Sequence, residues 1–166
     1  MLAYIIYNCD ENNGEYSFYD MDTDKATAEK KFKTDQLKQF LSVGGRCDID
    51  YLKMAEVDLS DADYAVMSGA DDDCYFSDDD FDAFTKDVDE DSKCKLIYEV
   101  SGDQAGMQLH QYWLDNQAKY PNIPEDIAGD DDYYFDFMEN LYTEDVTAYD
   151  KLVDDFIKSG KFTATV

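Results

Sequence analysis

The sequence has little of what binds nucleic acid or enters a membrane. One arginine, Arg46, and thirteen lysines stand against forty acidic residues, and the formal net charge is −26. Nucleic acids and anionic membranes are both bound through Lys and Arg, so each would repel a chain with this balance. We therefore expect a basic partner, with no direct binding to nucleic acid and no membrane association.

Targeting signals and long apolar runs are also missing. Residues 1–10 lack the positively charged start and the small-residue cleavage site of a secretory signal. No stretch approaches the ~20 apolar residues that span a bilayer. The four cysteines are isolated, with no C-x-x-C pair, and one histidine is the only further nitrogen ligand. This pattern is typical of reduced thiols in a cytoplasmic protein.

Motifs of the common enzyme classes are absent. There is no P-loop, no glycine-rich dinucleotide fingerprint and no G-x-S-x-G, and His110 is the one histidine available for a triad. Residues 20–31 begin with the aspartate spacing of an EF-hand calcium loop, but Lys25 takes the place of its glycine. We therefore predict a protein that is not an enzyme, with no catalytic residues, no metal site and no cofactor.

What is abundant is acid together with apolar side chains. Apolar residues make up 44% of the chain and aromatic residues 15%, which indicates a folded protein because acidic disordered segments have few aromatics. Two blocks hold most of the charge. The net charge is −6 over residues 1–24, +3 over 25–55, −14 over 56–91, zero over 92–124 and −9 over 125–166. This uneven distribution favours an interaction surface over a uniform solvation coat.

The local patterns predict an α+β protein of three or four strands and five or six helices. The residues between 2–8 and 15–19 are Asn- and Gly-rich, which indicates an N-terminal β-hairpin. Strands are expected at 2–8, 15–19, 93–100 and 162–166. Helices are expected at 25–41, 60–69, 77–86, 103–120, 131–142 and 144–158. Together they predict a small sheet, formed by the hairpin and later strands, packed with helices whose outer faces are acidic.

The length of 166 residues predicts a single domain spanning 1–166, with 1–91 and 92–166 as a possible subdivision. One short pattern occurs in both parts. A-D-D-D-C-Y-F at 70–76 is echoed by G-D-D-D-Y-Y-F at 129–135. The two copies either display similar aspartate triplets beside an aromatic anchor, or mark two acidic helix starts that favour the helix dipole. A third triplet at 78–80 is not explained by the second reading.

In size, acidity and aspartate clusters at 58–91 and 125–155, the chain resembles the DNA-mimic proteins of phages and mobile elements. These include anti-restriction proteins and some inhibitors of CRISPR nucleases. The resemblance implies an inhibitor that evades host defence in the host cytoplasm by occupying the positively charged groove of a restriction, CRISPR or nucleoid-type protein. The carboxylates expected to replace phosphates are Asp58, Asp61, Asp63, Asp71, Asp72, Asp73, Asp78, Asp79, Asp80, Asp82, Asp130, Asp131, Asp132 and Asp136.

Charge density is compatible with such mimicry. B-DNA carries one phosphate charge per ~1.7 Å of axis, so 26 charges correspond to roughly 44 Å, or about 13 base pairs. Asp outnumbers Glu 31 to 9, and its shorter side chain loses less rotamer entropy when it is fixed on binding. Crowded carboxylates should also raise several aspartate pKa values.

Other function classes remain open. The acidic surface is also suited to an adaptor that binds a basic protein surface unrelated to nucleic acid. A weaker alternative is a divalent-metal-dependent or carbohydrate-active enzyme, since forty acids supply many carboxylate pairs whose separation the sequence does not give. The lysine-rich helix at 25–41 departs from a uniformly acidic mimic. It faces an acidic part of a partner, supports a homodimer, or is simply solvated.

Overall fold

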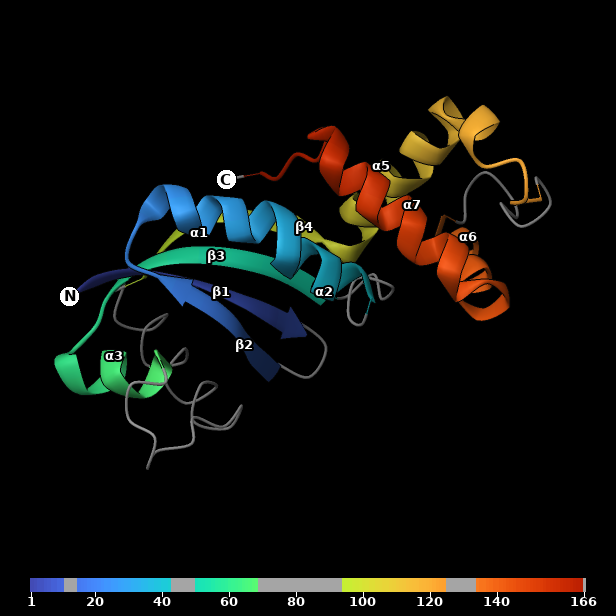
Figure 1. Cartoon of the computed structure of the whole chain (residues 1–166). Coiled ribbons are helices and arrows are strands. Elements are labelled where there is room, and N and C mark those ends of the chain that lie inside the picture. Colours follow the sequence, from blue (N-terminus) through green and yellow to red (C-terminus); the bar gives the residue numbers. More distant parts are fainter. Residues whose placement is uncertain (11–14, 43–49, 69–93, 125–133, 166) are drawn as a thin grey trace.

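The computed structural model describes residues 1–10, 15–42, 50–68, 94–124 and 134–165 (Figure 1). It confirms the predicted α+β class, with an antiparallel sheet that begins with the N-terminal hairpin. The strands are β1 (Leu2–Asp10), β2 (Glu15–Asp22), β3 (Asp50–Asp58) and β4 (Cys94–Ser101). The helices are α1 (Lys25–Lys31), the π-helical turn η1 (Phe32–Gln36), α2 (Leu37–Ser42), α3 (Asp61–Met67), α5 (Gly102–Asp115), the 3-10 turn η2 (Gln117–Lys119), α6 (Tyr134–Glu144) and α7 (Val146–Ser159).

The sheet has the strand order β2-β1-β3-β4, so β1 and β3 are central. Ile5 of β1 lies opposite Met21 of β2 on one side and Ala55 of β3 on the other. The β1–β2 register shifts after Ile6, where β2 has one extra residue. Such a bulge re-aims the side chains that follow it, here those of the last residues of β2.

Helices cover both faces of this sheet. On one face Tyr4 and Ile6 of β1 pack in the main core with Phe32 and Leu37 of the α1–η1–α2 helix. On the other face a smaller core includes Met67 of α3. Figure 1 shows α1 and α2 on one side of the sheet and α3 on the opposite side. Because successive strand residues point to opposite faces, both alternating sets of β1 side chains are apolar and buried.

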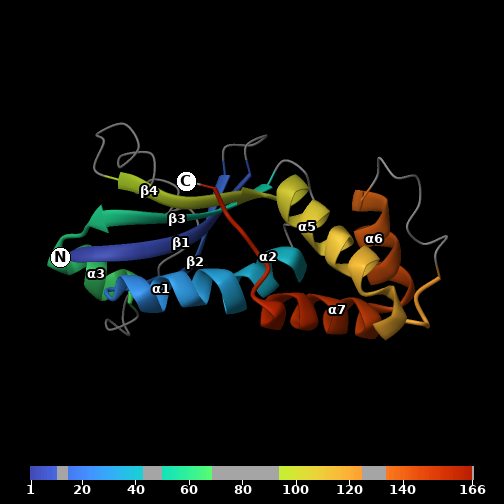
Figure 2. The same ribbon diagram turned by 90° about the horizontal axis from the view of Figure 1, so that it is seen from above.

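The helices α5, α6 and α7 form a group beyond one end of the sheet (Figure 2). Ser101 and Gln104 form a full capping box at the start of α5. Trp113 is buried in the same core as the α1–α2 helix, and Tyr149 Oη of α7 donates a 2.7 Å hydrogen bond to the Leu41 carbonyl oxygen of α2. None of the helices that the structure describes has the length and apolar character needed to cross a membrane.

Two sequence predictions differ from the structure. The sequence did not predict β3 as a strand, because its middle residues Lys53–Glu56 are good helix formers. In the structure β3 lies in the centre of the sheet, and its pairing with β1 and β4 imposes the extended conformation. The final strand predicted at 162–166 is reduced to one bridge, Thr165 with Glu99 of β4. The helix predicted at 77–86 lies outside the described residues.

The hydrogen bond from Tyr149 of α7 to the Leu41 carbonyl of α2 should contribute measurably to stability. Tyr149→Phe leaves the buried Leu41 carbonyl without its donor and should lower the free energy of unfolding by about 1–2 kcal/mol. Tyr64→Phe, which removes a half-exposed hydroxyl on α3, should change the free energy of unfolding by less than about 0.5 kcal/mol.

Urea unfolding should show that the sheet and the helical group unfold together, with coincident transitions by Trp113 fluorescence and far-UV circular dichroism. Two separated transitions would instead support two units, 1–91 and 92–166.

Candidate acidic interface

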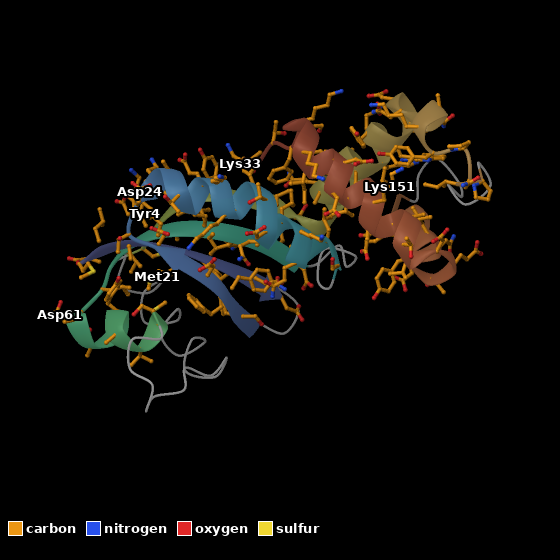
Figure 3. The ribbon with its side chains drawn as sticks, viewed as in Figure 1. Tyr4, Met21, Asp24, Lys33, Asp61 and Lys151 are labelled. Carbon is orange, nitrogen blue, oxygen red and sulfur yellow. The ribbon has the colours of Figure 1, made fainter. Side chains whose placement is uncertain are left out.

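Three of the predicted phosphate-replacing aspartates gather where β3 leads into α3. Asp58 is the last residue of β3, and its side chain is 81% exposed with Oδ1 2.8 Å from the N-terminal ammonium. Asp61 and Asp63 are exposed in the first turn of α3, and Figure 3 shows Asp61 on the side of the sheet opposite Lys33. Ser60 Oγ caps α3 by accepting a 3.1 Å hydrogen bond from the Asp63 N–H. The cap predicted from the sequence therefore fixes this acidic turn.

The other predicted aspartates cannot be placed in the same way. Asp136 lies in α6, but its side chain is not described. The rest lie outside the described residues: Asp71, Asp72, Asp73, Asp78, Asp79, Asp80, Asp82, Asp130, Asp131 and Asp132. The structure thus brings together Asp58, Asp61 and Asp63.

The lysines of the α1–η1–α2 helix are largely engaged within the chain. Lys31 Nζ lies 3.1 Å from Asp22 Oδ2 and 3.5 Å from Asp20 Oδ1. Lys38 Nζ lies 2.8 Å from Asp154 Oδ1 of α7, and Lys33 Nζ lies 5.3 Å from the centroid of the Tyr98 ring. Two lysines of the predicted basic block, Lys31 and Lys38, therefore compensate acids of their own chain. The α1–η1–α2 helix lies on the sheet face away from α3, with Asp24 on the same side as Lys33, whereas Asp61 lies on the α3 side (Figure 3).

The carboxylates around α1 were considered from sequence only as a calcium loop. In the structure Asp24 is the N-cap of α1 and accepts a 2.9 Å hydrogen bond from the Thr27 N–H, while Asp22 accepts one from the Asp24 N–H. The Thr27 hydroxyl also donates a 2.7 Å hydrogen bond to Asp24 Oδ2, and this bond, followed by that of the Thr27 N–H, lowers the pKa of Asp24. The hydrogen bond from the Asp24 N–H lowers the pKa of Asp22. Among the residues the structure describes, no group of three His, Cys, Asp or Glu side chains is placed to hold a metal ion.

Asp50 behaves as expected for a crowded carboxylate. Partial burial raises its pKa, and the charge of Asp10, its direct cross-strand neighbour, raises it further. Like charges placed opposite each other across two strands destabilise the pair. The expected rise in pKa is therefore seen here, whereas hydrogen bonding reverses it at Asp22 and Asp24.

Local charge counts could not have found the Asp20–Asp22–Lys31 group. The two aspartates are two residues apart on β2, but Lys31 reaches them only because α1 packs along that edge of the sheet. The alternation of Asp20 and Asp22 in a strand and the position of Lys31 on the following helix are the only sequence signals. Both become informative only once the helix has been placed on the sheet.

Comparisons of this chain with protein-family models, with curated proteins and with solved structures find no match. Function is therefore inferred from the charge and the geometry of the chain itself.

The opposite pKa shifts of Asp50 and Asp22 predict opposite effects of neutral substitutions. Because the folded state raises the pKa of Asp50, ionised Asp50 is destabilising at pH 7, and Asp50→Asn should raise the free energy of unfolding by about 0.5 kcal/mol. The gain should vanish as the pH falls through the raised folded pKa. Asp22→Asn should lower stability at pH 7, and this loss should shrink as the pH falls through the lowered folded pKa. Urea titrations at several pH values measure both, and a loss of stability in Asp50→Asn at pH 7 would contradict the assignment.

Proposed function

We propose that this protein is a non-enzymatic DNA mimic that occupies the positively charged nucleic-acid groove of a DNA-binding protein, such as a host defence protein. The observation that supports this best is the exposure of three predicted aspartates at the β3–α3 end. Asp61 and Asp63 are exposed in the first turn of α3 and Asp58 is exposed beside the N-terminal ammonium, whereas Lys31 and Lys38 are held in ion pairs by other carboxylates of the chain. The acidic end therefore faces its surroundings without these lysines.

The sequence that follows α3 is also rich in aspartate. α3 ends at Met67, and the sequence continues into residues 71–82, which contain seven of the predicted phosphate-replacing aspartates. These residues lie outside the described part, so their contribution is inferred from sequence alone. With Asp58, Asp61 and Asp63 they make residues 58–82 the densest source of negative charge near the described acidic turn.

The mechanism we propose is electrostatic. A groove lined by Lys and Arg holds condensed anions and attracts a surface of high negative charge density, which accelerates association. Fixed carboxylates at an ordered helix start lose little side-chain entropy when they contact such a groove. Nucleic acid is then excluded by competition for the same cations, and no chemical step is required.

Salt should affect the free protein and the complex in opposite directions. Screening of carboxylate repulsion should raise the melting temperature of the free protein as NaCl increases from about 20 to about 300 mM. Binding to the partner should weaken over the same range, because the electrostatic attraction is screened. Calorimetry of the free protein and binding assays measure the two effects. Tight binding that does not respond to salt would contradict a charge-based interface.

Competition with duplex DNA tests the proposal directly. The immobilised protein is incubated with nuclease-treated bacterial lysate, and bound protein is eluted with a duplex of about 13 base pairs, the length that matches its net charge. We expect a nucleic-acid-binding protein that the duplex releases. The triple variant Asp58→Asn, Asp61→Asn, Asp63→Asn should lose most of this retention.

The matched control carries the same charge change elsewhere. Asp35→Asn, Asp115→Asn, Glu144→Gln alters three exposed acids on three separate elements and should retain the partner. Equal loss in both triple variants would show dependence on net charge without a defined surface. A partner retained by the wild-type protein but not released by duplex DNA would overturn mimicry and support the adaptor alternative.

A further inference from the structure

A hollow of about 310 Å³ lies at the outer edge of the sheet, between β2 and α3. Charged side chains line one side of the hollow, and apolar and aromatic side chains line the other. The lining side chains used below are Asp20, Met21, Asp22, Lys31, Tyr64 and Met67. Figure 3 shows Met21 between the sheet and α3, on the sheet face opposite α1.

The strand edge beside the hollow is occupied by side chains of the same chain. β2 is the outermost strand, and within the described residues no further strand pairs with it. The Met21 N–H donates a 2.8 Å hydrogen bond to Asp20 Oδ1, and the Met21 carbonyl oxygen accepts one of 3.3 Å from Lys31 Nζ. Asp20 and Lys31 thus satisfy the backbone of Met21 where a neighbouring strand would otherwise do so.

The charged side of the hollow has more acceptors than cations. Lys31 divides a single positive charge between Asp20 and Asp22, which leaves a net charge of −1 at the mouth. Gln36 Nε2 donates a 3.2 Å hydrogen bond to Asp20 Oδ2. Gln36 does not itself line the hollow, so the acceptors open to a ligand there are the carboxylates of Asp20 and Asp22. A ligand with several N–H groups and one positive charge matches this set.

Resting on the function proposed above, we propose that the hollow receives one arginine side chain of the basic partner. Its guanidinium would bind Asp20 and Asp22 in place of Lys31, and its methylene stem would pack against Met67 and the Tyr64 ring. Arginine matches better than lysine because its planar fork can donate to two carboxylates at once and stacks on aromatic rings. The arginine would act as an anchor within an otherwise electrostatic interface.

Charge also decides against a second copy of the chain as the occupant. Asp20 and Asp22 lie on β2, and pairing two β2 edges would bring acidic side chains of two strongly negative chains together. Like charges placed across two strands oppose pairing. A basic segment neutralises the mouth of the hollow, whereas a second copy increases the repulsion.

A small-molecule titration tests the anchor without the partner. N-acetyl-arginine amide is added to protein with 13C-labelled methionine methyl groups, and the Met21 and Met67 signals are followed. We expect saturable shifts with a dissociation constant on the order of a millimolar. N-acetyl-citrulline amide, which has a similar shape without the charge, should give no saturable shift. Equal responses to both compounds, or arginine shifts that do not saturate, would overturn the proposal.

Two lysine variants separate this site from general charge effects. Lys31→Met removes the intramolecular competitor and should tighten arginine binding by roughly fivefold to tenfold. Lys30→Met makes the same charge change at an exposed neighbouring position and should change binding by less than about twofold. Asp22→Asn should weaken binding by at least roughly fivefold, and it decides the outcome if Lys31→Met does not fold. Indistinguishable behaviour of the two lysine variants, or unchanged binding in Asp22→Asn, would contradict the proposal.

The anchor and the mimicry can fail separately. The variant Asp58→Asn, Asp61→Asn, Asp63→Asn should keep saturable arginine binding while losing the partner. Loss of the arginine response in wild-type protein, with DNA-competed binding intact, would remove only the anchor. An intact arginine response together with a partner indifferent to DNA would remove only the mimicry.

Discussion

The fold depends on the burial of β1 on both of its faces. Tyr4 and Ile6 face one core, while Ala3, Ile5 and Tyr7 face the other, so residues 3–7 of the strand are buried on both sides. Both sheet faces must then be covered, by the α1–η1–α2 helix on one side and α3 on the other. A chain this rich in carboxylates must then place them where they reach solvent or a polar partner, because a buried unpaired charge is strongly unfavourable. The arrangement of acids therefore follows from the position of the apolar centre.

Net charge alone overstates the surface that is available to a partner. Asp24 and Asp145 cap helices, and Asp155 accepts a 2.7 Å hydrogen bond from Tyr120 Oη. Asp22 and Asp154 pair with lysines. These carboxylates support the fold, whereas Asp61 and Asp63 are exposed in the first turn of a helix that is capped by the hydrogen bond from the Asp63 N–H to Ser60. Mimicry is therefore better judged from which carboxylates remain uncommitted than from their total.

Sequence patterns predicted the elements that local signals define. The hairpin, the Ser60 cap and the helices at α1–α2, α5, α6 and α7 were recognisable from alternation, helical periodicity and capping residues. β3 was missed because its residues favour a helix and only the neighbouring strands impose the extended form. The helix start at Ser60 and Asp63 was predicted because its capping pattern is local, while the Asp20–Lys31 group was missed because it joins β2 to α1 through packing. Nonlocal contacts of this kind leave no fixed spacing in the sequence.

The π-helical turn Phe32–Gln36 has a consequence for how this helix can evolve. In a regular α-helix, residues five apart such as Phe32 and Leu37 point roughly 140° apart, yet both are fully buried against the same core. The wider turn aligns them and leaves room for one additional residue. A descendant that lost one residue here would keep its apolar face aligned as an ordinary helix, but it would have no side chain to replace Gln36 beside Asp20. The residue that the wider turn accommodates therefore matters for the polar edge of the sheet more than for its core.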